Sequence, residues 1–277
     1  MDWWQALLLG FVQGLTEFLP VSSSGHLMIF KELLGVDAEG FLDFTVAVHF
    51  ATVLSTVVVF WKVILGLLKD FFKFKDNDGT DYVLKIVVSM IPVAIVGLFF
   101  KDKVEAFFGN GLGTVGICLL ITAFLLILSD LLSKHTGCLA DRKQYRNGIS
   151  YWQALLVGVS QALAVAPGLS RSGTTIATGL IGGVRRDNIA QFSFLMVLVP
   201  ILGEQMLDCL DLALAPMNGE ALPSVGFMPL AVGVLAAFVS GLFACKVMVN
   251  LVKKAKLKWF AMYCALVGII ILAISAL

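Results

Sequence analysis

Charged residues are scarce in this chain. Asp, Glu, Lys and Arg make up 14% of its 277 residues, and the formal net charge is only +1. The chain has no basic tail and no stretch in which basic residues alternate with aromatic ones. Proteins that bind nucleic acid carry such clusters to neutralise phosphates. The composition therefore excludes a nucleic-acid-binding protein, and it lies far outside the range of ordinary soluble domains.

Cysteine motifs are missing as well. The five cysteines are scattered with no CxxC pair and no zinc-ligand spacing, so we interpret them as small apolar residues. The first residues, MDWWQALLLG, contain no basic cluster, and we therefore expect no cleavable signal peptide. The cysteines are Cys118, Cys138, Cys209, Cys245 and Cys264.

Long apolar runs dominate what is present. Hydrophobic residues make up 59% of the chain, and the mean hydropathy is +0.94. A bilayer core about 30 Å thick needs about 20 apolar residues in a helix, and these runs are too continuous for the alternating strands of a barrel. The sequence therefore predicts an all-α polytopic membrane protein with about six transmembrane helices. The predicted spans are 44–60, 84–100, 113–132, 190–207, 228–245 and 259–276.

The segments between these spans differ in charge. The segments 61–85, 133–150 and 246–258 each carry several Lys and Arg residues, whereas 31–43 and 204–227 are mainly acidic. Lysine and arginine are enriched in cytoplasmic loops. We therefore expect the first three segments on the cytoplasmic side and the last two outside.

An internal repeat relates the two halves of the chain. With a shift of 148 positions, Trp4–Gly25 aligns with Trp152–Gly173, and 11 of the 22 residues are identical. Three predicted spans separate the two copies, so the second copy has the opposite orientation in the membrane. The sequence predicts a single integral membrane domain, 1–277, that is an inverted-topology repeat of about 1–135 and about 150–277.

Each copy of the repeat contains a break in its apolar run. Leu19-Pro20 interrupts the first copy and Ala166-Pro167-Gly168 the second, and small polar residues follow each break. Irregular backbone at membrane depth is tolerated where protein or a watery cavity surrounds it. We therefore predict two re-entrant helix-turn-helix elements, each entering and leaving on one side. A plain kinked span is the alternative.

The two breaks place small polar residues at the start of a helix. Pro20 ends one helix, and a following serine caps the next, which leaves backbone N–H groups directed into the turn. The second copy repeats this with Ser170 and Ser172 and adds Arg171. Helix N-termini bind anions, and a guanidinium binds phosphate oxygens in a fixed geometry. Two such turns from opposite sides would form a phosphate site.

Arg171 and Glu17 are the charged residues of these turns. A guanidinium in an apolar environment costs at least about 2.5–3.5 kcal/mol, so Arg171 needs a partner. A buried ion pair with Glu17 is one solution, and a bound phosphate is another. Glu17 is also a candidate general base or metal ligand, and Gln13 lies one helical turn before it. Their oxygen atoms suit a hard cation such as Mg²⁺ or Ca²⁺.

The histidines receive different interpretations. His26 follows three serines, which is the arrangement for a hydroxyl nucleophile with a nearby base, or for a histidine that itself attacks phosphorus. His49 stands alone in a predicted span, and we interpret it as a satisfied polar residue. Arg185 and Arg186 are interpreted as marking a cytoplasmic boundary.

The motifs QGLTEFLPVSSSGH and PGLSRSGTT resemble the undecaprenyl-diphosphatase family, integral membrane phosphatases associated with bacitracin resistance. The resemblance covers essentially the whole chain, including FWK after the first continuous span and FSFLMVLVP at 192–200. It implies hydrolysis of undecaprenyl pyrophosphate to undecaprenyl phosphate and phosphate, which recycles the lipid carrier for cell-wall synthesis. It also implies a divalent cation, Mg²⁺ or Ca²⁺, and a site that opens to the outer face of the bacterial inner membrane.

The resemblance implies roles for individual residues. Arg171 would bind phosphate, Glu17 would be the main metal ligand or base, and Ser23 is the preferred nucleophile. This chain has Gln13 where many relatives have glutamate, which weakens the case for a two-carboxylate metal site. The implied catalytic residues are Glu17, Ser22, Ser23, His26 and Arg171, the implied metal ligands are Glu17 and Gln13, and the implied substrate-binding residues are Gln13, Ser24, Gly25, Ser170, Ser172, Gly173 and Thr175.

Two other classes of function remain open from the residues alone. Inverted repeats with broken helices are common in transporters, so a polyprenyl-phosphate transporter or flippase is the alternative. A structural membrane subunit is a third hypothesis, to which Arg171 gives little support. The expected partners are a polyprenyl pyrophosphate lipid and the bilayer, and a homodimer is left open.

Overall fold

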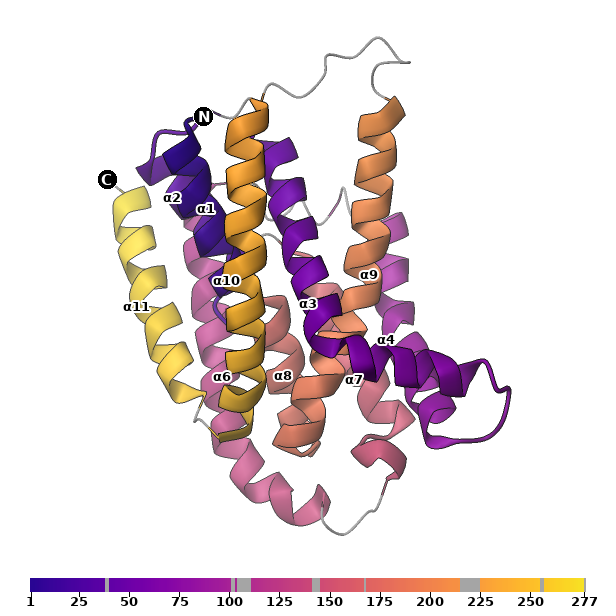
Figure 1. The fold of residues 1–277 in the computed structure, drawn as a ribbon. Coiled ribbons are helices and arrows are strands. Elements are labelled where there is room, and N and C mark those ends of the chain that lie inside the picture. Colours follow the sequence, from indigo (N-terminus) through magenta and orange to yellow (C-terminus); the bar gives the residue numbers. More distant parts are fainter. Residues whose placement is uncertain are drawn as a thin grey trace.

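A computed structural model gives the fold, and helices are the regular secondary structure of the residues that it describes (Figure 1). Those residues are 1–37, 40–100, 103, 111–140, 145–166, 168–214, 225–254 and 257–276. The α-helices are α1 (Trp3–Thr16), α2 (Ser23–Leu33), α3 (Phe41–Phe71), α4 (Asp78–Phe99), α6 (Leu112–Ala140), α7 (Tyr151–Leu163), α8 (Arg171–Ile181), α9 (Arg186–Leu214), α10 (Phe227–Lys254) and α11 (Lys258–Ser275), and a 3-10 turn, η1 (Arg146–Gly148), precedes α7.

Five of these helices are long and apolar enough to cross a membrane, counting only the described residues. They are α3, α4, α6, α10 and α11, and each matches one of the predicted spans to within one residue or contains it whole. The remaining predicted span, 190–207, lies within α9. The prediction of an all-α polytopic membrane protein is therefore confirmed.

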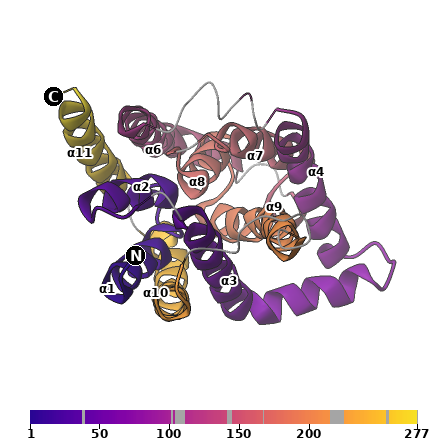
Figure 2. The same ribbon diagram turned by 90° about the horizontal axis from the view of Figure 1, so that it is seen from above.

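The helices extend beyond the predicted spans. The segment 61–85 was predicted as a loop, but α3 continues to Phe71 and α4 begins at Asp78, so only 72–77 connects them. Hydropathy marks where apolar sequence ends, whereas backbone hydrogen bonding continues through charged residues such as Lys62 and Lys69. Figure 2 shows the C-terminal part of α3 leaving the bundle sideways.

The two broken elements are hairpins of similar construction. In the first, the Gln5 side chain accepts from the Asp2 N–H and donates to the Leu34 carbonyl oxygen, at 2.7 and 3.0 Å. In the second, Gln153 accepts from the Ser150 N–H and donates to the Gly182 carbonyl oxygen, both at 2.8 Å. Each glutamine thus ties the start of a hairpin to its end, so each element turns back on itself and is not a plain kinked span. They lie toward opposite ends of the molecule (Figure 1).

The first helix of each hairpin packs against a long helix from the other half of the chain. Helix α1 of the first half packs on α10 of the second, and α7 packs on α4 (Figure 2). At each crossing point the two helix backbones are so close that only glycine fits between them. A Cβ on Gly10 would lie 2.2 Å from the Gly233 carbonyl oxygen, and one on Gly158 would lie 2.1 Å from that of Ser89. Each hairpin is therefore held by the other half of the chain.

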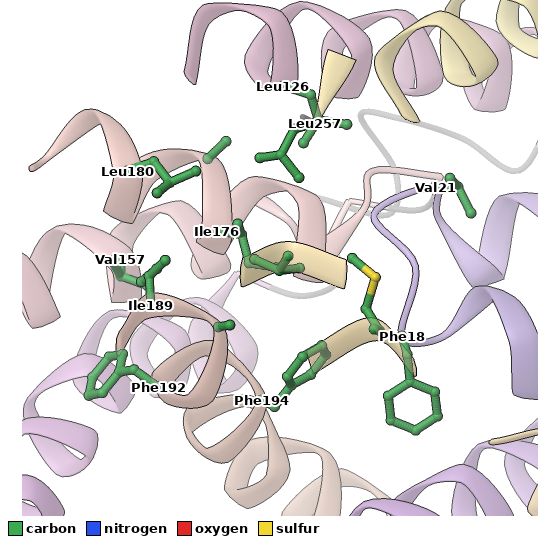
Figure 3. Close-up of a cluster of buried hydrophobic side chains, with 14 of the residues drawn as sticks. Phe18, Val21, Leu126, Val157, Ile176, Leu180, Ile189, Phe192, Phe194 and Leu257 are labelled. Atoms are coloured by element: carbon green, nitrogen blue, oxygen red, sulfur yellow. The ribbon is translucent and has the colours of Figure 1, made fainter. Parts of the chain in front are cut away.

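One hydrophobic core joins the hairpins to the long helices. Phe18 and Val21 come from the turn of the first hairpin, and Ile176 comes from α8. Phe18 packs against Phe194 of α9 with ring centroids 6.1 Å apart (Figure 3). All of these side chains are buried. The two turns consequently have little freedom to move apart.

Arg186 anchors the start of α9. Its guanidinium donates to Asp130 of α6 at 2.5 Å, and the other oxygen of Asp130 accepts from the backbone N–H of Lys258 at 2.8 Å. The starts of α9 and α11 are thereby tied to the same residue of α6.

Candidate active site

The turns of the two hairpins meet. The Ser172 hydroxyl donates to the Leu19 carbonyl oxygen at 3.1 Å, and the Gly168 N–H donates to the Ser24 hydroxyl oxygen at 3.4 Å. Each serine satisfies a backbone group of the other hairpin. Because irregular backbone inside a membrane must be satisfied by protein groups, these bonds support both turns at once. Residues more than 140 positions apart therefore form one polar site.

Each turn presents the start of a helix. The Ser22 hydroxyl accepts from the Gly25 N–H at 3.3 Å and caps α2, and the Ser170 hydroxyl accepts from the Gly173 N–H at 3.1 Å and caps α8. These N–H groups of the two glycines are thus used by the caps. Ser22 has a left-handed conformation with φ of 68°. Strained backbone of this kind is concentrated at functional sites.

Glu17 is the centre of the polar cluster. Its Oε2 accepts from the Ser23 hydroxyl at 2.5 Å and from the Gln13 side-chain amide at 2.9 Å. Its Oε1 lies 3.6 Å from Nη2 of Arg171. The first hairpin therefore supplies a carboxylate and a hydroxyl in direct contact, and the second hairpin supplies the cation that faces them.

Arg171 is only partly engaged by this ion pair. At 3.6 Å the guanidinium is close enough to Glu17 for attraction but too far for a normal hydrogen bond. The Arg171 side chain is 27% exposed, whereas that of Glu17 is 13% exposed. A buried ion pair with no other purpose would be expected to close to hydrogen-bonding distance. The separation leaves guanidinium N–H groups for an anion.

His49 belongs to this cluster, although its sequence context predicted only a satisfied polar residue. Its Nε2 lies 3.7 Å from Oε2 of Glu17, and its Nδ1 is 2.8 Å from the Thr45 carbonyl oxygen. A sequence signal was available, because polar residues recur at helical spacing along one face of this span. These residues are Thr45, His49, Thr52 and Thr56.

His26 lies in the first turn of α2 with both ring nitrogens engaged. Nδ1 is 2.8 Å from the Ser22 carbonyl oxygen, and Nε2 is 2.8 Å from the Tyr263 hydroxyl of α11. Since the carbonyl can only accept, Nδ1 carries the proton and Nε2 accepts from Tyr263. The ring is buried and stacks on that of Tyr263. Tyr263 was not singled out by the sequence, because nothing local connects it to His26.

Thr175 lies one turn along α8 from Arg171. Its hydroxyl is 2.6 Å from that of Ser193 on α9 and 2.8 Å from the Arg171 carbonyl oxygen. The residue is fully buried. The structure thus gives Thr175 a packing contact that holds α8 against α9, and Arg171 begins the same helix.

The metal-binding potential of the site is limited. Among the described residues, no group of three or more His, Cys, Asp and Glu side chains is arranged to hold an ion. Gln13 is fully buried, and its Oε1 has no hydrogen-bond partner in the part of the chain that the structure describes. An unpaired buried oxygen beside a carboxylate fits a cation. The donor set is therefore incomplete without oxygen atoms from a substrate or water.

Comparison with known proteins gives a consistent result over the whole chain. A family profile described as "Bacitracin resistance protein BacA" matches residues 6–270. A relative from Bacteroides fragilis named "Undecaprenyl-diphosphatase" is 52% identical over 278 residues and covers all of both chains. Relatives with the same name from Parabacteroides distasonis and Halothermothrix orenii are 50% and 39% identical, again over all of both chains.

Proposed function

The chain belongs to the bacitracin resistance protein BacA family, and on that basis we propose that it is an undecaprenyl-diphosphatase, a membrane enzyme that hydrolyses undecaprenyl pyrophosphate to undecaprenyl phosphate and phosphate. The observation that carries the chemistry is the contact between Glu17 and Ser23 opposite Arg171. A base, a hydroxyl and a phosphate-binding cation are groups that phosphoryl transfer uses to position the nucleophile and to stabilise developing charge.

The pyrophosphate binds between the two hairpin turns. Arg171 and the N-terminal ends of α2 and α8 provide positive charge and N–H donors for its oxygens. Ser24 and Ser172 bridge the turns and keep this surface in one shape. The prenyl chain extends into the bilayer along the apolar helices.

Ser23 is the preferred nucleophile. Its hydroxyl already donates to Glu17, so the carboxylate can take the proton as Ser23 Oγ attacks the terminal phosphorus. The bond from that phosphorus to the bridging oxygen breaks, and undecaprenyl phosphate leaves. Water then attacks the phosphoserine and releases phosphate, while the Ser23 oxygen recovers a proton from Glu17. Direct attack by a water oriented by the same pair gives the same products.

His26 and Ser22 act as positioning residues in this proposal. Both ring nitrogens of His26 are engaged, so the histidine is poorly placed to attack phosphorus. Ser22 caps α2 and sets the direction of the first turn, which carries Ser23. Their contribution is to hold the nucleophile at the start of the helix.

A divalent cation such as Mg²⁺ or Ca²⁺ fits this site with Glu17 and Gln13 as protein ligands. The fit rests on the buried, unpaired Oε1 of Gln13 next to the Glu17 carboxylate. When bound, a cation stabilises negative charge on phosphoryl oxygens. The chain's own contribution is to hold the two oxygen ligands one helical turn apart.

The site is proposed to face the outer side of the bacterial inner membrane. The acidic segments 31–43 and 204–227 and the basic segments 61–85, 133–150 and 246–258 support this orientation. Hydrolysis there returns the lipid carrier for cell-wall synthesis. The transporter alternative gains no support, because the relatives carry the name of a hydrolase.

Phosphate release from a polyprenyl pyrophosphate in detergent tests this function, because detergent leaves no compartments for transport. We expect Glu17→Gln to lower turnover by about 10³-fold and Arg171→Lys by about 10²-fold. Glu32→Gln, at an exposed position of α2, and Arg185→Lys, just before α9, are matched controls that should keep normal turnover. Absence of phosphate release by the unmodified chain would contradict the proposal.

A further inference from the structure

His49 has the environment of a metal ligand. Its Nδ1 lies 2.8 Å from the Thr45 carbonyl oxygen, which can only accept, so Nδ1 carries the ring proton. In the neutral ring the lone pair is then on Nε2, and this atom faces Oε2 of Glu17 at 3.7 Å. Histidines that bind metals typically donate their other ring N–H to a carbonyl or carboxylate in this way.

The separation of the two atoms fits a shared ion. Two atoms that each bind one cation at about 2.1–2.2 Å are about 3.0 Å apart at a right angle and about 3.7 Å apart at 120°. Two lone pairs facing each other repel unless a proton or a cation lies between them. The Glu17 to His49 distance therefore matches a pair of ligands to the same ion.

A third donor is already at the same carboxylate. The Gln13 amide donates to Oε2 of Glu17 at 2.9 Å, and its buried Oε1 has no partner among the described residues. Arg171 approaches the other oxygen, Oε1, whereas Oε2 faces His49 and accepts from the Ser23 hydroxyl and the Gln13 amide. An ion bound at Oε2 would take the place of the Gln13 N–H, with that amide turned so that its Oε1 faces the ion. The three side chains come from α1, the first turn and α3, which explains why sequence spacing does not reveal the set.

We propose that His49 is a nitrogen ligand of the divalent cation at this site, together with Glu17 and Gln13, and that it shifts the preference of the site from Ca²⁺ and Mg²⁺ toward Mn²⁺. The inference rests on the proposed cation-assisted hydrolysis. Ca²⁺ and Mg²⁺ favour sites made of oxygen, whereas an imidazole nitrogen favours transition metals. One carboxylate against two positive charges leaves the site cationic, which suits a pyrophosphate.

The test measures Mn²⁺ binding directly, in the full chain in detergent, by electron spin echo envelope modulation. We expect ¹⁴N modulation from a coordinated imidazole on bound Mn²⁺, and we expect it to change to ¹⁵N modulation in protein labelled with [¹⁵N]histidine. This comparison needs no substitution, so it does not depend on whether a variant folds. Bound Mn²⁺ without histidine nitrogen coupling would overturn the proposal.

Two substitutions identify which histidine is bound. His49→Gln exchanges nitrogen for oxygen, and should remove the ¹⁴N modulation while lowering the preference for Mn²⁺ over Ca²⁺ about tenfold. His26→Gln is the matched control and should keep the modulation, because Nε2 of His26 is engaged by Tyr263. Loss of the signal in His26→Gln and its persistence in His49→Gln would refute the assignment.

A third variant tests the affinity. His49→Leu removes the donor altogether and should weaken Mn²⁺ binding at least about tenfold. Unchanged Mn²⁺ affinity in this variant would contradict the proposal. The result is separate from phosphate release: hydrolysis without histidine coupling refutes only the metal ligand, and histidine coupling without hydrolysis refutes only the proposed function.

Discussion

The two hairpins share a backbone plan but differ in the side chains at their turns. Both are closed by a glutamine near the start, and both cap their second helix with a serine. At equivalent positions, however, the first hairpin has Glu17 and Ser23 where the second has Val165 and Arg171. The two copies thus share a backbone arrangement but differ in their reactive groups, with the carboxylate and the serine hydroxyl in one half and the guanidinium in the other.

This division explains why the hairpins must meet. Neither turn alone holds both the carboxylate and the guanidinium, and the contact of 3.6 Å between Glu17 and Arg171 exists only across the repeat interface. The bonds of Ser24 and Ser172 cross the same interface. An inverted repeat brings its two turns together from opposite sides, which is how many membrane proteins form sites near the middle of the bilayer.

The largest expected effect separates the chemical roles of the hairpins. Ser23→Ala removes the proposed nucleophile and should lower phosphate release by at least about 10³-fold, with the fold intact. Ser172→Ala, in the second hairpin, removes one hydrogen bond to Leu19 and should cost about 1 kcal/mol of stability, with at most about a tenfold loss of turnover because the phosphate-binding surface is held less firmly. Phosphate release and thermal unfolding of the purified variants give the comparison. Equal loss of turnover in both would mean that chemistry is not confined to the first hairpin.

The next effect concerns the glycine contacts that hold each hairpin to the other half. Gly10→Ala and Gly158→Ala force a methyl group against a backbone carbonyl, and each should destabilise the protein by about 1–3 kcal/mol. Gly66→Ala is the control, because an added methyl group would meet nothing there. Thermal unfolding in detergent measures the difference. If both variants unfolded at the same temperature as the unmodified protein, the two helices at each crossing would be able to move apart and accommodate the methyl group.

A smaller effect is expected from the glutamines that close the hairpins. Gln5→Ala and Gln153→Ala each remove a bond between the two ends of a hairpin and should cost about 1 kcal/mol. If the two hairpins have equivalent backbone structures, the two losses of unfolding free energy should agree within about 0.5 kcal/mol. A loss confined to one variant would break the structural equivalence.

The smallest effect concerns a contact that only the first hairpin makes. Tyr263→Phe removes the hydroxyl that donates to Nε2 of His26, while the ring remains to stack. We expect a loss of turnover of about three- to tenfold through looser positioning of the turn, which corresponds to one hydrogen bond. Steady-state kinetics measure it. A loss as large as that of Ser23→Ala would instead give His26 a direct chemical role.

Local sequence patterns predicted much of this arrangement. The apolar runs, the proline breaks after Leu19 and Ala166, and the repeated Trp-Gln start predicted spans and hairpins, because hydropathy, capping and helix breaking act over a few residues. The positions of helix ends were less accurate. The segment 61–85 is mostly helix, since charged residues can continue a helix beyond the bilayer.

Part of the site was also accessible from the sequence. Gln13, Glu17 and Ser23 lie within one short stretch, and the repeat pointed to Arg171 as their counterpart. His49 and Tyr263 were missed. His49 contacts Glu17, which is 32 positions away, and Tyr263 contacts His26, which is 237 positions away.

The sequence by itself determined that this chain is helical, lies in a membrane and carries two related polar turns, because each of these properties depends on neighbouring residues. Only the tertiary structure decided which polar groups share the site. The packing of α1 on α10 and of α7 on α4 sets how far each hairpin reaches, and the register of α3 and α11 then places His49 and Tyr263. Such contacts follow from the close packing of distant helices, which no local pattern encodes.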